Sequence, residues 1–153
     1  MMELKTSSGV GVIGSEREAR MHHVGYVVPS IVEGAKGFAE SLSGSWDERI
    51  FADPLQCVRV TFLTGLCATD PLVELIEPAG EKSPVLSFLK KGGGLHHLCY
   101  EVNSLEDHLD FMRSAGGKIV RSPVPAVAFD GRRIAWVYTK YRLLVELLET
   151  KKG

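Results

Sequence analysis

HHVGYVVPSIVE, which begins at His22, returns as HHLCYEVNSLED, which begins at His96, 74 residues later. A second pair repeats at nearly the same offset, because LVELIE at residues 72–77 returns as LVELLE at residues 144–149. Two motifs that repeat in the same order at matching spacing indicate a duplicated structural unit. Each unit opens on a histidine-bearing segment and closes on a glutamate-bearing one. Two units packed about a pseudo-twofold axis would therefore bring two histidines and two carboxylates together.

The composition is that of an ordinary soluble globular domain. A chain of 153 residues with 44% hydrophobic and 24% charged residues can bury a core without disulfides. Its formal net charge is −1 and its basic residues are dispersed, so no electrostatic footprint for nucleic acid or an anionic membrane stands out. A small-molecule partner fits this surface better.

The cysteines and the N-terminal segment bear on the compartment. Cys57, Cys67 and Cys99 show no CxxC spacing, and an odd number of thiols suits a reducing compartment. The first twenty residues contain only the short apolar stretch GVGVIG, which is too brief for a signal sequence or a membrane span. We therefore expect residues 1–20 to form a mobile tail and the protein to be cytoplasmic.

The apolar pattern predicts a βαβββ order in the first copy. Apolar residues alternate from Met21 to Val28, as in a half-buried strand. Ser30 is a good helix N-cap, and apolar residues at helical spacing follow up to Leu42. Three more strands are expected at residues 47–51, 58–63 and 72–77.

The second copy repeats that order. A short helix over VLSFLKK and a glycine run form a connector at residues 81–93, and a helix capped by Ser104 runs up to Gly116. Strands are expected at residues 95–102, 118–121, 133–138 and 143–149. The sequence therefore predicts an α+β domain in which a first module, residues 21–80, packs against a second, residues 94–150, with a cleft between them.

Strand alternation predicts which histidine of each pair faces the cleft. His22 and His96 share their face with bulky apolar side chains, which should pack on the helix. His23 and His97 share theirs with smaller side chains and are therefore the expected cleft residues. On this basis His97→Ala should remove most bound metal, whereas His96→Ala should chiefly affect stability.

The closing strands supply the carboxylates. Glu74 and Glu146 lie inside apolar runs, where a carboxylate needs a partner, whereas Glu77 and Glu149 face the other side. A single strand histidine is often structural, and shared ancestry alone can preserve matching residues. Independent structural roles do not readily explain the complete set. Two imidazoles and two carboxylates suit one divalent ion, Zn, Co, Ni, Mn or Fe, without identifying which.

At these residues the chain resembles the vicinal-oxygen-chelate superfamily of glyoxalases, bleomycin resistance proteins and dioxygenases. The resemblance covers about residues 21–150 and implies paired βαβββ modules that form a cup-shaped half-barrel, the glyoxalase-like fold. Within the superfamily the chain looks most like methylmalonyl-CoA epimerases, because VRVTFL, VELIEP, SPVLSFLKK, GGGLHHLCYEV and LLVELLE follow their order and spacing. The resemblance implies four metal ligands: His23, Glu74, His97 and Glu146.

The chemistry implied by the resemblance is epimerisation of an acyl thioester through a metal-stabilised enolate. A proton would leave the carbon between a thioester and a carboxylate and return on the opposite face, while the metal stabilises the developing charge. Acid and base groups remain necessary, and Glu146 is the expected catalytic residue. The substrate would be linked to CoA or to a carrier protein. A homodimer is expected from the resemblance alone.

The sequence departs from the epimerase pattern around the expected substrate. Some epimerases carry a glutamate where this chain has Val60, and a loop that is commonly Gly-Ala-His-Gly reads Ala-Phe-Asp-Gly at residues 128–131. Asp130 in this loop is equally typical of a turn. Basic residues nearby could meet a CoA phosphate or belong to a solvated face. Six residues are expected to contact substrate: Gln56, Val60, Phe129, Asp130, Gly131 and Arg132.

Three other functions fit the same superfamily. A glyoxalase I type enzyme, a lactoylglutathione lyase, can use the same ligand set, although the GLHH segment and the SPVLSFLKK connector favour the epimerase branch. A binding module of the drug-sequestering kind would hold a ligand without reacting it, and retention of all four ligands argues against it. An epimerase or isomerase of another acyl thioester remains open because of the altered loop.

Overall fold

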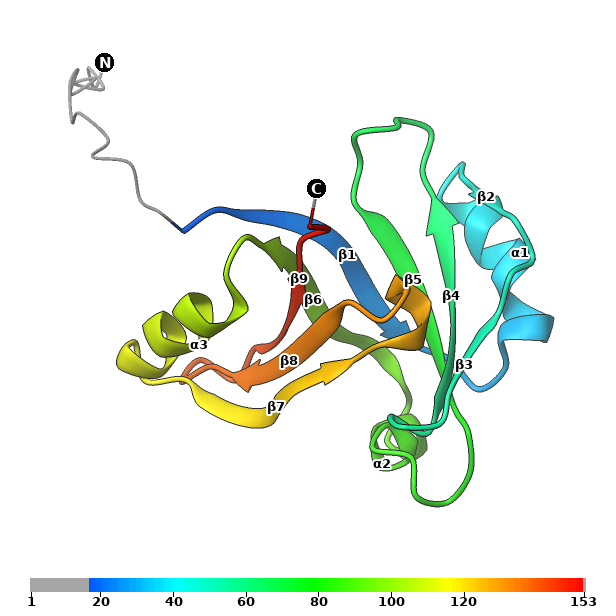
Figure 1. Cartoon of the computed structure of the whole chain (residues 1–153). Coiled ribbons are helices and arrows are strands. Elements are labelled where there is room, and N and C mark those ends of the chain that lie inside the picture. Colours follow the sequence, from blue (N-terminus) through cyan, green and yellow to red (C-terminus); the bar gives the residue numbers. More distant parts are fainter. Residues whose placement is uncertain (1–16, 153) are drawn as a thin grey trace, which may run out of the picture.

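Residues 17–152, the part of the chain described by this computed structural model, are built mainly of strands (Figure 1). The first half contains β1 (Ala19–Val27), α1 (Ile31–Ser41), β2 (Ser45–Trp46), β3 (Phe51–Asp53), β4 (Val58–Thr64) and β5 (Leu72–Pro78). The short helix α2 (Leu86–Lys90) follows, within the predicted connector. The second half contains β6 (Gly94–Val102), α3 (Leu105–Ser114), β7 (Lys118–Pro125), the 3₁₀ turn η1 (Val127–Phe129), β8 (Arg133–Tyr138) and β9 (Leu144–Glu149).

The strands of the described residues form one open, mixed sheet whose two halves have the same topology and are related by a pseudo-twofold axis. The strand order is β2-β4-β5-β1-β6-β9-β8-β7, with β3 paired to β4. β1 and β6 are antiparallel at the centre, and each also pairs in parallel with the closing strand of its own half, β5 or β9. The predicted α+β fold class is confirmed. The module boundaries at residues 80 and 94 stay a prediction.

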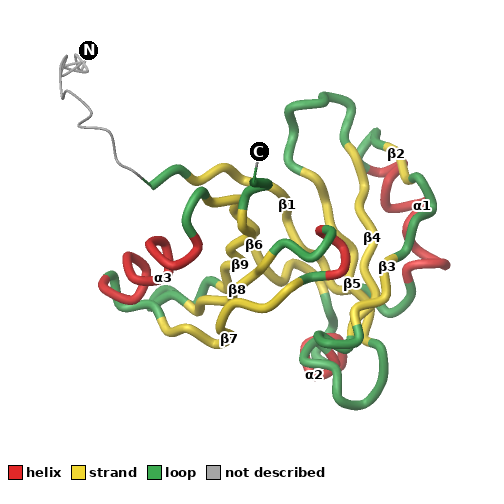
Figure 2. The backbone as a smooth tube through the Cα atoms, viewed as in Figure 1, coloured by secondary structure: helices red, strands yellow, loops and turns green. Residues whose placement is uncertain are grey.

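Helices α1 and α3 lie at opposite ends of the molecule, each on the outside of its own half of the sheet (Figure 2). Both begin at a predicted serine cap: Ser30 Oγ accepts a hydrogen bond from the amide of Glu33, and Ser104 Oγ accepts one from the amide of Asp107, each at 3.3 Å. Each helix then buries one apolar stripe against its own half-sheet. The outer faces of the two half-sheets are thereby covered, and their inner faces are left for a site.

Two predicted boundaries in the first half are wrong. β1 starts at Ala19 instead of Met21, so residues 19 and 20 of the predicted tail belong to a strand. Residues 1–16 of that predicted tail lie outside the described residues. The strand expected at residues 47–51 is instead split into β2 and β3. The reason is local, because Asp47 binds the amide of Arg49 at 3.0 Å and Glu48 has a φ of 64°, which together make a turn.

No helix between residues 17 and 152 combines the length and the apolar character needed to cross a lipid bilayer. The longest, α1, has 11 residues. The cytoplasmic location stays a prediction.

Glu77 ties the end of β5 to the start of α1. Its carboxylate is buried, accepts a hydrogen bond from the amide of Ile31 at 2.7 Å, and pairs with Arg59 on β4. A negative charge at a helix N-terminus is favourable because the first amides of the helix have no internal partner. The corresponding acid of the second half, Glu149, pairs with Arg133 near the surface.

We predict that Glu77→Ala lowers the free energy of unfolding by about 1–3 kcal/mol, because a buried amide and a guanidinium lose their acceptor. Urea denaturation followed by circular dichroism measures this change. The matched control is Glu149→Ala, whose loss should stay within about 1 kcal/mol, as is usual for solvent-exposed pairs. Equal losses in the two variants would contradict the role assigned to Glu77.

Candidate metal centre and substrate cavity

Four buried side chains meet where the two half-sheets join. Their potential ligand atoms all lie within 4.8 Å of one another, and none of the four residues is more than 5% exposed. The Nε2 atoms of His23 and His97 are 3.1 Å apart. The Oε2 atom of Glu74 lies 3.2 Å and 3.3 Å from these two nitrogens, and that of Glu146 lies 3.5 Å and 3.1 Å from them.

Strand register produces this convergence. The four residues come from the four adjacent central strands, β5, β1, β6 and β9. Gly25 of β1 lies opposite Glu74 on one side and His97 on the other. Its counterpart Cys99, on β6, lies opposite His23 and Glu146. The predicted set is thus brought together by the pseudo-twofold relation between the halves, and its role as a ligand set stays a prediction.

The electrostatics of the four groups are mutually dependent. Burial alone would lower the pKa of His23 and His97, but the two carboxylates beside them outweigh it and raise the pKa of both imidazoles. Burial alone would likewise raise the pKa of Glu74 and Glu146, but the imidazoles outweigh it and lower the pKa of both carboxyls. Two imidazole nitrogens and two carboxylate oxygens that converge on one point are the donor set of a mixed nitrogen and oxygen site, so these residues fit a divalent metal ion.

The predicted faces of the other two histidines are wrong. The pairing of β1 with β6 shifts register between Met21 and His23, which leaves His22 as an extra residue on its strand. A second shift leaves His96 as an extra residue of β6. Such β-bulges re-aim a side chain, and here both histidines of each pair lie on the same side, with ring centroids 5.2 Å apart.

The bulged histidines are only partly buried, and both have a lowered pKa. Burial and the neighbouring charge of His97 lower the pKa of His96 to about 4. Burial and the charge of His23 likewise lower the pKa of His22. In both pairs the bulged imidazole is therefore harder to protonate than its neighbour.

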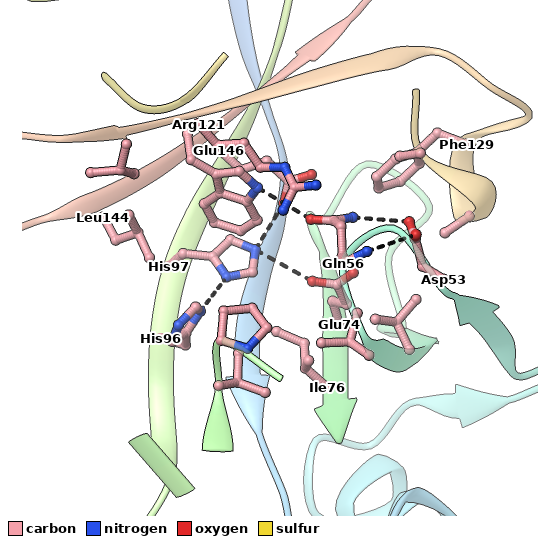
Figure 3. Close-up of a pocket in the computed structure, with 18 residues that line it drawn as sticks. Asp53, Gln56, Glu74, Ile76, His96, His97, Arg121, Phe129, Leu144 and Glu146 are labelled. Carbon is pink, nitrogen blue, oxygen red and sulfur yellow. Dashed lines mark hydrogen bonds and ion pairs between the residues drawn. The ribbon is translucent and has the colours of Figure 1, made fainter. Parts of the chain in front are cut away.

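A cavity of about 290 Å³ opens onto the centre (Figure 3). Glu74, His97 and Glu146 line it. Most of its other walls are apolar, and they include Val58, Ile76, Val85, Ala126, Leu144 and Trp136. Of the predicted substrate contacts, three line this cavity: Gln56, Val60 and Phe129.

The remaining predicted substrate contacts lie elsewhere. Asp130 and Arg132 line a second hollow of about 410 Å³ that shares Phe129 with the first. Gly131 lines neither hollow. Asp130 has a φ of 53°, so it is the turn residue that its position before glycine also suggested. Arg132 donates to Glu101 at 2.8 Å, which holds its side chain away from the first cavity.

Trp136 and Asp53 are among the cavity residues that the sequence did not predict. The Trp136 ring lies edge-on to His97, with centroids 4.6 Å apart, and its Nε1 donates to Gln56 Oε1 at 3.3 Å. Asp53 is buried and accepts hydrogen bonds from Gln56 Nε2 at 3.0 Å and from the amide of Val127. The repeat offset of 74 residues pairs Trp136 with Phe62, which lies against His23, and could have identified it.

The sequence model of the Glyoxalase/Bleomycin resistance protein/Dioxygenase superfamily matches residues 22–136. The chain belongs to this superfamily. The matched range contains three of the four central residues, and the open, duplicated sheet agrees with the fold expected of a member. The resemblance inferred from the motifs is therefore confirmed.

Within the superfamily, several relatives are named as epimerases. The ethylmalonyl-CoA/methylmalonyl-CoA epimerase of Cereibacter sphaeroides is 31% identical over 79% of this chain and 89% of that protein. The mitochondrial methylmalonyl-CoA epimerase of Dictyostelium discoideum is 28% identical over 94% of this chain and 89% of that protein. The crystal structure of methylmalonyl-CoA epimerase from Mycobacterium tuberculosis superposes with a TM-score of 0.74 at 24% identity, covering 86% of this chain and 88% of that chain, which shows the shared fold.

We predict that Gly25→Ala weakens metal binding, because an added Cβ would lie 2.1 Å from Cε1 of His97 and displace its ring. The dissociation constant for Zn²⁺, measured by competition with a chelator, should rise at least about tenfold, the loss expected when a ligand is misoriented. The matched control is Gly34→Ala on α1, where the added Cβ meets no atom within 4 Å. Unchanged affinity in Gly25→Ala would show that the His97 ring is not confined as described.

Proposed function

We propose that this protein is a metal-dependent epimerase of the methylmalonyl-CoA epimerase type. The observation that carries the proposal is the burial of two histidines and two glutamates at one end of an apolar cavity. The relative of known name that is 31% identical acts, by that name, on ethylmalonyl-CoA and methylmalonyl-CoA. The substrate class proposed here is accordingly an acyl thioester with a second carboxylate on the α carbon.

His23, Glu74, His97 and Glu146 would hold the metal ion. When bound, a divalent ion supplies positive charge that stabilises the negative charge developing on the thioester oxygen as the α proton leaves. The donor set suits Zn, Co, Ni, Mn or Fe. Strand backbones hold all four side chains, so they keep their positions when the substrate enters.

Glu146 is the proposed proton carrier. Its carboxylate lines the cavity beside the expected metal position, where a carboxylate oxygen can accept the α proton of a bound substrate. Val60 also lines the cavity, and its side chain can neither give nor take a proton. The chain therefore does not use that position for the proton on the second face, although some epimerases carry a glutamate there.

The walls of the cavity suit a small acyl group. Apolar side chains exclude water from the region in front of Glu146, and this strengthens every electrostatic interaction there. Arg121 is the one arginine or lysine among the described residues that line the cavity, and its Nη2 donates to the carbonyl of Leu55 at 3.1 Å. Its remaining donors are available to a carboxylate or phosphate of the substrate. A CoA or carrier-linked thioester, a homodimer and a cytoplasmic location complete the proposal.

We predict that the metal-loaded protein exchanges the α hydrogen of methylmalonyl-CoA for deuterium in D₂O. Proton NMR would show loss of the α signal and conversion of the methyl doublet to a singlet-like signal. Prior removal of the metal with a chelator should abolish the exchange, and addition of a divalent ion should restore it. Absence of exchange in protein of verified metal content would exclude this substrate and favour another thioester or a hemithioacetal of the glyoxalase type.

We further predict that Glu146→Gln slows this exchange by about 10²- to 10⁴-fold, the usual contribution of a positioned acid or base. The matched control is Glu74→Gln, because the amide oxygen of glutamine can still serve as a metal ligand. The control should bind the metal and keep most of the exchange rate. A rate that falls equally in both variants, at equal metal occupancy, would remove Glu146 as the proton carrier.

A further inference from the structure

The two bulged histidines make the same contact in both halves of the molecule. Nδ1 of His22 lies 2.9 Å from Nδ1 of His23, and Nδ1 of His96 lies 2.9 Å from Nδ1 of His97. The first contact is seen beside the second hollow and the second beside the cavity. Figure 3 shows His96 and His97 joined in this way, with the Nε2 side of His97 turned toward Glu74 and Glu146.

Hydrogen placement in each contact follows from its length. Two nitrogens 2.9 Å apart share a single hydrogen, so one imidazole donates and the other accepts. A neutral histidine that offers the lone pair of Nε2 to a metal carries its hydrogen on Nδ1. Metal ligands of this kind usually donate that hydrogen to a second residue, which fixes both tautomer and ring orientation.

We propose that His22 and His96 are positioning residues, each of which accepts the Nδ1 hydrogen of the histidine that follows it and so holds the Nε2 lone pair of that histidine toward the metal. The inference rests on the proposed metal centre. It also explains the two β-bulges. In a regular strand His22 and His96 would lie on the opposite face, where they could not contact His23 and His97.

The two halves differ in how much they depend on this contact. The thiol of Cys99 lies beside His23 as a second hydrogen-bonding neighbour. The equivalent residue in the other half is Gly25, which offers no side chain to His97. Loss of the acceptor should therefore affect His97 more than His23.

The tautomers can be read in the wild-type protein loaded with Zn²⁺. Long-range ¹H–¹⁵N correlation of the imidazole rings should show hydrogen on Nδ1 of His23 and His97. It should show hydrogen on Nε2, and an unprotonated Nδ1 that accepts a hydrogen bond, in His22 and His96. The reverse tautomer in either bulged histidine would overturn the proposal for that half.

Substitutions separate hydrogen bonding from packing. His96 packs against Phe88 and Trp136, with ring centroids 5.0 Å and 6.2 Å away, so His96→Phe keeps an aromatic ring but removes the acceptor. His96→Asn loses the ring but keeps an acceptor oxygen near the position of Nδ1. If His96 positions His97, the phenylalanine variant should bind Zn²⁺ about 10- to 100-fold more weakly, and the asparagine variant should recover most of the affinity.

The same pair of substitutions at His22 should have the same effect on Zn²⁺ affinity, with the phenylalanine variant weaker than the asparagine variant. The loss of affinity should be smaller than at His96. His108, a buried histidine on α3, is the control, and His108→Phe should leave the affinity unchanged. A phenylalanine variant that binds as tightly as wild type, or more tightly than the asparagine variant, would assign a packing role and overturn the proposal. Should His96→Phe fail to fold, the wild-type tautomers decide.

The outcomes distinguish this inference from the function on which it rests. A wild-type protein that binds no divalent ion overturns both. A wild-type protein that binds the ion and exchanges the α hydrogen, with variants that all keep its affinity, overturns the positioning role alone.

Discussion

The burial of two carboxylates beside two imidazoles, at the junction of two half-sheets, is the constraint on which the structure depends. A charged group removed from water costs several kcal/mol unless a partner compensates it, and Glu74 and Glu146 are 5% and 2% exposed. The imidazoles of His23 and His97 provide that partner. The compensation needs four strands in fixed register, because a slip of one residue would turn a donor to the other face. The parallel and antiparallel pairings at the centre of the sheet provide this register.

Duplication gives the chain a nearly symmetric set of donors. The side chains around that set differ between the two halves, so its surroundings are asymmetric. The ring against His97 is Trp136, which lines the cavity, whereas the ring against His23 is Phe62, which lines the second hollow. Phe129 lies in the wall of both hollows. The cavity therefore reaches the nearly symmetric centre from one side only.

The histidine pairs show where reasoning from strand periodicity ends. Alternation assumes one residue per step on both strands, and on that assumption His22 and His96 belong against the helices. A bulge adds one residue to a strand, and here no particular residue type marks its position. How two distant strands pair decides where it occurs. The choice of His23 and His97 agreed with the geometry, but the face predicted for their neighbours did not. The contacts of His22 with His23 and of His96 with His97 therefore could not be predicted before the pairing of β1 with β6 was known.

Local patterns in the sequence determined the elements and the four central residues. The repeated motifs gave the order of strands, Ser30 and Ser104 set the helix starts, and equivalent positions singled out the histidines and glutamates. These features depend on neighbours along the chain or on the repeat, and both can be recognised in the sequence alone. Tertiary structure alone decided which side chains line the cavity. Trp136, Asp53 and Arg121 reach the cavity from separate strands. Asp130 and Arg132 lie within three residues of Phe129 in the sequence, yet they line the second hollow instead. Side-chain direction at a turn and pairing between remote strands arise from packing, and no local pattern records them.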